Sequence, residues 1–189
     1  MWRKNMSKVD FTIENIDAEM IIAKKTIQKE IPLPEGYEYV PFSNQYQDKI
    51  SALYKELNIN INLDEKIQSQ REIFKNHCLL VTLKNELVGF LCLLKDESQC
   101  LYLACTAVKE GHQHKGIGKA MISKCCMNFD RIKGKYPLYA KVNAQAYNEI
   151  KLLSKMEFTP FLGQTSTKSE EESVQDWERI TKILKEKQV

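Results

Sequence analysis

The stretch from Cys78 to Val108 contains three apolar runs of strand length, separated by only two short polar turns. In HCLLVTLKNELVGFLCLLKDESQCLYLACTAV the turns are KNE and KDES. Strands joined by so few residues pair in antiparallel fashion, because a parallel pair needs a long crossover. This stretch constrains the fold most, since it predicts an antiparallel meander to which the other elements must attach.

Strand and helix patterns precede the meander. YEYVPFS, after Gly36, predicts a strand, and helical spacing of apolar residues predicts helices over 44–58 and 62–76. The expected caps are Ser43 for the first helix and a capping box of Asn62 and Glu65 for the second, whose inner face would carry Ile67, Arg71 and Phe74.

The same patterns continue after the meander. A helix begins near Ile117, PLYAKV predicts a strand, and AQAYNEIKLLSKMEF predicts a further helix. The inward side chains expected on these two helices are Ile117, Ala120, Met121, Cys125, Phe129, Ile150, Leu153 and Met156. From Tyr37 onward the order of elements is therefore β, α, α, β, β, β, α, β, α, which indicates an α/β (α+β) fold.

Both ends of the chain add amphipathic segments. NIDAEMIIAKKTIQKE predicts an N-terminal helix, and FTPFLGQ predicts a last strand before a polar linker. A C-terminal helix over Ser173 to Lys187 carries an apolar stripe that must be buried, either on this domain against the N-terminal helix or in a homodimer. The residues of the two stripes are Ile16, Met20 and Ile27 at the first end and Val174, Trp177, Ile180 and Leu184 at the second.

The size and charge of the chain limit what it binds. With 189 residues, 43% of them hydrophobic, we expect one domain made of an N-terminal extension (1–36), a core (37–163) and a linker with a helix (164–189). A net charge of +3 gives no field that favours nucleic acid or an anionic membrane as partner. No apolar run is long enough to span a membrane, and MWRKNMSKVDF lacks signal-peptide features, so we expect a cytoplasmic protein.

The cysteines and histidines show no metal-ligand spacing. The six cysteines lie within apolar segments without CxxC pairs, which favours reduced core thiols over disulfides or zinc, and we expect no metal. The residues concerned are Cys78, Cys92, Cys100, Cys105, Cys125, Cys126, His77, His112 and His114.

The stretch EGHQHKGIGKAMISKCC places two glycines and several basic residues between the last meander strand and a helix. A turn of this kind can aim backbone N–H groups at one point, where the helix dipole favours an anion such as phosphate. Gly116 and Gly118 have no side chain that would keep a phosphate away from the backbone N–H groups. A basic rim is supplied by His112, His114, Lys115 and Lys119. The alternative is a plain strand-to-helix turn with a solvated basic loop.

The chain lacks the P-loop spelling and the third glycine of the dinucleotide fingerprint. The spelling VKEGHQHKGIGKAM instead resembles the acetyl-CoA motif of the GNAT superfamily of N-acyltransferases, [RQ]-x-x-G-x-[GA] after a valine-ended strand. Gln113, Gly116 and Gly118 match its three defining positions, and Val108 matches the strand end. With the order of elements, the resemblance covers about Tyr37 to Phe161.

The resemblance implies a GNAT fold: a mixed, mostly antiparallel sheet with helices on both faces, splayed between its fourth and fifth strands. Acetyl-CoA is the implied co-substrate, with its pantothenate arm in the splay. The backbone of Ala107 and Val108 would pair with the pantetheine amides. The implied pyrophosphate seat comprises Gln113, His114, Lys115, Gly116, Ile117, Gly118 and Lys119, and Asn148 is a further candidate contact.

The family's next motif, N-x-x-A-x-x-[LF]-Y-x-K-x-G-F, is only partly kept. Anchored on Val142, Lys155 and Phe158, the motif places Ala146 at the asparagine, Glu149 at the alanine, Leu152 at [LF], Leu153 at the tyrosine and Glu157 at the glycine. The tyrosine commonly protonates the leaving thiolate in the family, and leucine cannot. Tyr147 or Asn148 could offer a replacement contact, or could be ordinary helix residues.

A general base is equally hard to identify. The strand CLYLACTAV carries no carboxylate, and its polar candidates are Tyr102 and Thr106, which strand alternation places on one face. Both could instead be core residues with satisfied hydroxyls. Cys105 has no neighbour that would activate it as a nucleophile.

The expected function is transfer of an acetyl group from acetyl-CoA to a primary amine of a small molecule or peptide, by direct attack in a ternary complex. The alternatives are a GNAT-fold binding or regulatory protein that holds coenzyme A without turnover and a structural or interaction protein whose basic loop binds nothing specific. In the family the helices over 44–76 cover the acceptor side. Their candidate side chains are Tyr46, Asp48, Glu56, Asp64, Glu65 and Glu72, although a solvated helix face also explains the acidic ones.

Overall fold

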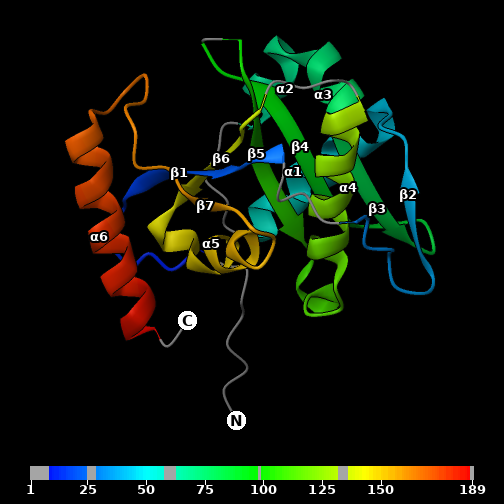
Figure 1. The fold of residues 1–189 in the computed structure, drawn as a ribbon. Helices are drawn as coiled ribbons and strands as arrows, with labels where there is room; N and C mark the ends of the chain where they lie inside the picture. The colour runs from blue at the N-terminus through cyan, green and yellow to red at the C-terminus, as the bar shows by residue number, and fades with distance from the viewer. Residues whose placement is uncertain (1–8, 25–28, 58–62, 98, 132–135, 188–189) are drawn as a thin grey trace.

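A seven-stranded sheet forms the centre of the molecule (Figure 1). The structure is a computed structural model that describes residues 9–24, 29–57, 63–97, 99–131 and 136–187. The strands are β1 (Asp17–Ile22), β2 (Tyr37–Val40), β3 (Cys78–Leu83), β4 (Glu86–Lys95), β5 (Leu101–Val108), β6 (Leu138–Asn143) and β7 (Thr159–Pro160). The helices are α1 (Gln47–Glu56), α2 (Leu63–Ser69), α3 (Arg71–His77), α4 (Ile117–Arg131), α5 (Tyr147–Ser154) and α6 (Glu170–Glu186).

The meander over β3, β4 and β5 is confirmed, with antiparallel pairing throughout. Lys84 and Asn85 join β3 to β4 with φ of 48° and 68°, so both central residues of the hairpin are left-handed. Two such residues give the turn the same twist as the strands. The order across the sheet is β2-β3-β4-β5-β6-β1-β7.

The expected N-terminal helix is wrong for residues 17–22, which form strand β1 in the sheet. All six residues of β1 pair antiparallel with β6, and β7 pairs on the other side of β1. Met20 and Ile22 are buried two residues apart, a period of two, whereas the helical reading relied on Ile16 and Met20 four apart. Ile27 lies outside the described residues. The N-terminal segment thus separates β6 from the short strand β7.

The helical segment before the meander also differs in detail from the expectation. The helix expected over 62–76 is two helices, interrupted at Gln70, whose side chain bonds both the N–H and the C=O of Lys95 at 2.7 and 2.8 Å. Arg71, expected inside, is exposed and donates to Asn44. Ser43 precedes a 3-10 turn without capping it through its side chain, and Asn62 lies outside the described residues.

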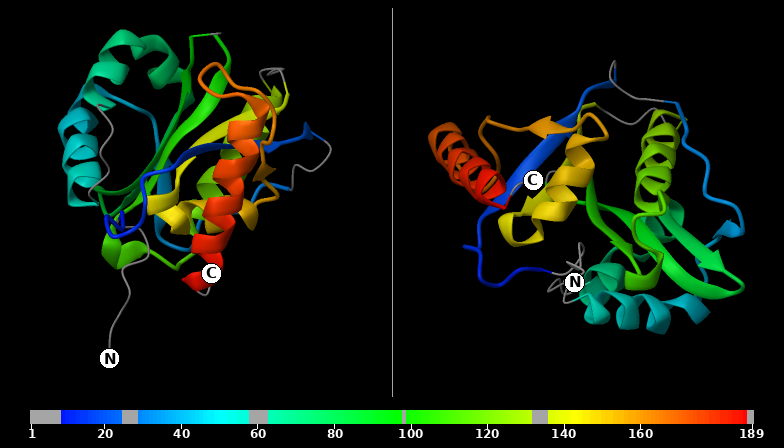
Figure 2. Two further views of the ribbon diagram at one scale, coloured as in Figure 1. Left: turned by 90° about the vertical axis from the view of Figure 1, so that its left-hand side faces the viewer. Right: turned by 90° about the horizontal axis from the view of Figure 1, so that it is seen from below.

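Helices cover both faces of the sheet, as predicted (Figure 2). On one face, α1, α2 and α3 pack with Phe90 and Leu94 of β4 into one core cluster. On the other face, α4 and α5 pack with Leu91 and Leu93 of the same strand into a second cluster. The inward residues predicted for α4 and α5, from Ile117 to Met156, are all buried.

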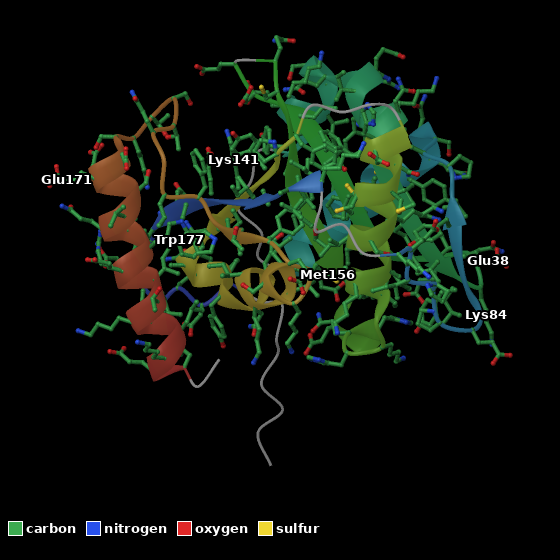
Figure 3. All side chains as sticks on the ribbon, in the orientation of Figure 1. Glu38, Lys84, Lys141, Met156, Glu171 and Trp177 are labelled. Carbon is green, nitrogen blue, oxygen red and sulfur yellow. The ribbon has the colours of Figure 1, made fainter. Side chains whose placement is uncertain are left out.

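The C-terminal helix is confirmed and lies on this domain. It begins at Glu170, three residues earlier than predicted, and a capping box of Ser169 and Glu172 fixes its start. Trp177 and Ile180 are 5% and 0% exposed within the second cluster, and the Trp177 indole N–H donates to the carbonyl of Glu19 at 3.2 Å. Figure 3 shows Trp177 between α6 and the sheet, with Glu171 on the opposite side of the helix. The helix therefore docks on β1 and not on an N-terminal helix.

Strands β5 and β6 diverge, as predicted. They are parallel and pair only at Tyr102 with Tyr139 and at Leu103 with Ala140. From Ala104 to Val108, β5 therefore has an edge without a β6 partner. The open edge ends at Val108, where the chain enters the glycine turn that leads into α4.

Candidate functional site: a cleft between diverging strands

The turn between β5 and α4 holds two residues with positive φ, His114 at 62° and Gly116 at 93°. Glycine adopts such a conformation at little cost, whereas side chains with a β-carbon rarely do. A β-carbon added at Gly116 would meet no atom within 4 Å, so the backbone there faces open space. Helix α4 begins at the next residue, and its first N–H groups thus lie at an accessible helix N-terminus.

Hydrogen bonds fix the shape of this turn before any ligand binds. The Gln113 side chain donates to the carbonyl of Val108 at 2.9 Å, and the Lys109 N–H donates to the carbonyl of Val88 at 2.8 Å. His112 Nδ1 lies 3.0 Å from the Tyr37 hydroxyl, which ties the turn to β2. Burial lowers the pKa of His112, and the charge of Lys115 lowers it further.

A cleft of about 1040 Å³ runs from this turn through the gap between β5 and β6 to α6. The sequence-predicted residues that line it are Tyr102, Thr106, Val108, Gln113, His114, Gly116, Ile117, Gly118, Lys119 and Asn148. Ala107, Lys115 and Tyr147 do not line it. One continuous cavity thus joins most of the predicted coenzyme A residues to a region that sequence reasoning did not assign.

The open edge of β5 exposes the backbone of alternate residues. The N–H of Lys109 is directed to β4, whereas the carbonyl of Val108 and the N–H of Thr106 bond to side chains on the other side. Because strand residues alternate, the groups of Ala107 face β4, not the gap. The backbone groups that remain for a ligand in the gap are therefore the N–H of Val108 and the C=O of Thr106, whereas those of Ala107 face β4.

Tyr102 and Thr106 do not share a face of the sheet, so that expectation is wrong. Cys92 pairs with Cys105 but Leu93 pairs with Leu103, which leaves Ala104 as an extra residue in β5. Such a bulge reverses the alternation of side chains beyond it. Tyr102 lies on the side of α1 to α3, with the Lys141 ammonium 4.4 Å from its ring centre, whereas Thr106 faces α4 and α5.

Tyr147 packs against the core and does not line the cleft. Leu153, at the tyrosine position itself, is fully buried. Burial also raises the pKa of the Cys105 thiol, which argues against a thiolate nucleophile. Among the residues that the structure describes, no cluster of His, Cys, Asp or Glu could hold a metal ion.

Glu149 is the functional candidate that the sequence analysis missed. It lies on α5 and lines the cleft, and its carboxyl group accepts a hydrogen bond from the N–H of Thr106. Burial raises its pKa to about 7. The available signal was the replacement of the small residue of the family motif by a glutamate at this position.

The far half of the cleft is built from segments near the two ends of the sequence together with β6. Its lining includes Glu19 of β1, Lys141 of β6, Lys168 and Asp176. Burial raises the pKa of Glu19, and the charge of Lys141 opposes this rise. Of the acceptor-side residues expected from 44–76, none lines the cleft among those whose side chains are described.

The fold and the cleft define a mixed α/β protein whose sheet opens between two parallel strands beside a helix N-terminus. A model of the acetyltransferase (GNAT) family matches residues 47–158, which is more than half of the chain. The chain therefore belongs to the GNAT acetyltransferase family, and the predicted resemblance is confirmed. No curated protein matches the sequence.

Solved structures of low identity share the fold. A GCN5-related N-acetyltransferase from Sphaerobacter thermophilus is 14% identical, with a TM-score of 0.61 over 78% of this chain and 49% of that one. The ribosomal-protein-S18-alanine N-acetyltransferase of Escherichia coli is 14% identical, with a TM-score of 0.55 over 65% and 77%. Diaminobutyrate acetyltransferase of Paenibacillus lautus, solved with its substrate and coenzyme A, is 18% identical, with a TM-score of 0.52 over 63% and 73%.

The chain spans about half the length of the first two structures of this kind, the second being a Drosophila protein. Within the described residues, the structure has no helix of the length and apolarity needed to cross a bilayer.

Proposed function

We propose that this protein is an N-acetyltransferase that moves an acetyl group from acetyl-CoA to a primary amine of a small molecule or peptide in the cytoplasm. The observation that carries this proposal is the continuity of the cleft, which joins the Gly116 turn to the open edge of β5. A binding site for an anionic, strand-like ligand requires both features side by side.

The residues of the cleft fit coenzyme A. The open space beside Gly116 would accommodate the pyrophosphate, with N–H groups from Gln113 to Lys119 as donors. The backbone of Val108 and Thr106 and the Asn148 side chain would contact the pantetheine arm. The hydroxyl of Thr106 is buried and, within the part of the chain that the structure describes, has no hydrogen-bond partner, as expected of a group that a ligand satisfies.

Acetyl-CoA supplies an activated thioester, and the chain supplies position and polarity. An amine held in the far half of the cleft, near Glu19, would lie on the other side of the gap from the turn. Holding the two reactants together lowers the barrier through proximity, and a strand N–H can polarise a carbonyl. This arrangement favours direct attack in a ternary complex over an acyl-enzyme on Cys105, whose thiol stays protonated.

The second candidate function is coenzyme A binding without turnover. Leu153 favours it, because a fully buried leucine occupies the position from which family members commonly donate a proton. In this case the cleft would bind coenzyme A as tightly as the proposed transferase does, but no amine would be acetylated.

A two-stage assay separates these functions. Acetyl-CoA is first added to the full chain, and the melting temperature is expected to rise because the ligand binds the folded state only. Release of free thiol from acetyl-CoA is then measured with a panel of primary amines. Thiol release that depends on an amine supports the transferase. A higher melting temperature without thiol release supports the binding protein. If acetyl-CoA neither raises the melting temperature nor releases thiol, both proposed functions are refuted.

A further inference from the structure

Glu149 lies where the cleft passes between α5 and the open edge of β5. Its carboxyl group accepts a hydrogen bond from the N–H of Thr106, one of the strand donors that face the gap. The hydroxyl of the same threonine is buried and has no hydrogen-bond partner among the described residues. Two side chains able to exchange a proton or a hydrogen bond with a ligand thus lie together in the lining of the cleft.

No ion pair with a described residue holds the Glu149 carboxylate. Charged and titratable groups line the same cleft from each neighbouring element: Cys105 on β5, Lys119 on α4, Lys141 on β6, and Lys151 and Lys155 on α5 itself. The charge of Glu149 contributes to the raised pKa of the Cys105 thiol. Burial without a cation favours the protonated carboxyl, and its pKa of about 7 allows both forms near neutrality.

We propose that Glu149 is the catalytic acid–base residue of the transfer, and this assignment rests on the proposed function. The amine nitrogen forms a bond to the acyl carbon, the carbon–sulfur bond breaks, and its electron pair leaves on sulfur. The Glu149 carboxyl gives its proton to that sulfur. The proton that the nitrogen loses returns to the carboxylate directly or through water, so the acid is restored and no further reactant is needed.

Other side chains at this point of the cleft are less suited to the role. Tyr102 lies on the opposite face of the sheet from Thr106, and burial raises its pKa above the usual value of a phenol. Leu153, one helical turn beyond Glu149 on α5, has no proton to give. A carboxyl group with a pKa near the working pH exchanges protons efficiently in both directions.

The kinetic test compares the wild type with Glu149→Gln, which keeps the shape and can still accept the Thr106 hydrogen bond. With acetyl-CoA and the most reactive amine of the panel, we expect kcat to fall roughly 100-fold with little change in KM. In the wild type, kcat should decline as the pH rises through about 7, because the acid form is lost. In Glu149→Gln, kcat should no longer decline above pH 7 and should only rise with pH, because the amine substrate loses its proton. Glu149→Asp should recover part of the rate.

A second measurement needs no ligand. The folded protein keeps the Glu149 carboxyl protonated up to about pH 7, whereas the unfolded chain loses this proton near pH 4.5. The stability that results from this difference is complete below pH 4.5 and is lost as the pH rises through 7. The melting temperature of Glu149→Gln should therefore exceed that of the wild type by a margin that grows from pH 5 to pH 8. The matched control is Glu178→Gln, the same change at an exposed position of α6, which should follow the wild type in both measurements.

The outcomes are distinct. Equal kcat and identical pH profiles in wild type and Glu149→Gln would overturn the assignment and leave the proposed function standing. A defect confined to the KM for acetyl-CoA, or a stability margin that does not vary with pH, would also overturn it. A wild type that releases no thiol with any amine would overturn the proposed function and, with it, the role of Glu149.

Discussion

The two walls of the cleft are built in different ways. One wall consists of β5, the glycine turn and α4, which follow one another along the chain from Leu101 to Arg131. The other combines β1, near one end of the sequence, with α6, near the other end. The elements of the first wall are continuous in sequence, whereas the second wall needs Glu19 and Trp177, 158 residues apart, to meet across it.

The two walls also differ in what they contribute to the cleft. The first wall presents backbone donors and a positive-φ glycine, which are features of an anion seat. The second wall contributes packing through Trp177 and Ile180, and charge through Glu19 and Lys168. Changes in the packing residues of the second wall should therefore act mainly on stability, and changes in the first wall mainly on affinity for coenzyme A.

The largest effect is expected from a truncation after Gly163, which removes α6. Burying Trp177, Ile180 and the half-buried residues beside them is worth on the order of 5 kcal/mol, a large part of the stability of a domain. The truncated chain should melt at a lower temperature or aggregate, as measured by calorimetry and size-exclusion chromatography. A truncated chain that stays monomeric and equally stable would show that the second wall needs no support from α6.

Trp177→Phe is the matched control for this truncation. It keeps most of the apolar surface and removes the hydrogen bond from the indole N–H to the carbonyl of Glu19. The expected loss of stability is about 1 kcal/mol, well below that of the truncation. Similar losses in the two variants would mean that the hydrogen bond, and not burial, holds α6.

The contrast between the walls also explains what the sequence could predict. The meander, α4 and the glycine turn are local patterns, so apolar spacing and the two glycines were enough to locate them. The segment 17–22 has a helical spacing at Ile16 and Met20, and only pairing with β6, more than 100 residues away, makes it a strand. The bulge at Ala104, which separates Tyr102 from Thr106, likewise has no signal in the strand itself.

The candidate site divides along the same line. The turn from Gln113 to Lys119 was located from residue types at fixed spacing, and all of its residues except Lys115 line the cleft. Glu149 was visible only as a departure from a motif, since its proposed role depends on its half-buried position on α5 and on its contact with Thr106 of β5. A titratable group buried by distant elements cannot be recognised from its neighbours in sequence.

The next largest effect is expected from Gly116→Val in the first wall. A branched side chain would fill the open space beside the turn, and valine does not tolerate the φ of 93°. Binding of coenzyme A should be abolished in calorimetry, while circular dichroism stays close to the wild type and the melting temperature falls by only the few degrees that the backbone strain costs.

Gly111→Val is the control for this change. Gly111 lies in the same turn, a β-carbon there also meets no atom within 4 Å, and its φ is not positive. Gly111 does not line the cleft, so the affinity of Gly111→Val for coenzyme A should match that of the wild type. If Gly116→Val bound coenzyme A normally, the anion seat would have to be sought elsewhere along the cleft.

The smallest effect is expected from Lys115→Ala, which tests how far the first wall acts through charge. Lys115 is exposed and does not line the cleft, so it can act on a bound pyrophosphate only through solvent. Its charge nevertheless reaches the turn, because it lowers the pKa of His112. An exposed charge of this kind is worth at most about 1 kcal/mol, which corresponds to an affinity loss of about fivefold.

The dependence on salt distinguishes this charge from a direct contact. The screening length falls from about 30 Å at 0.01 M salt to about 8 Å at 0.15 M, so Lys115→Ala should weaken coenzyme A binding more at the lower concentration. Calorimetry at both concentrations measures this, with Lys182→Ala, an exposed lysine of α6 outside the cleft, as the control. A loss of the same size at both concentrations would show that Lys115 touches the ligand directly, and the first wall would then close around coenzyme A more tightly than its open turn indicates.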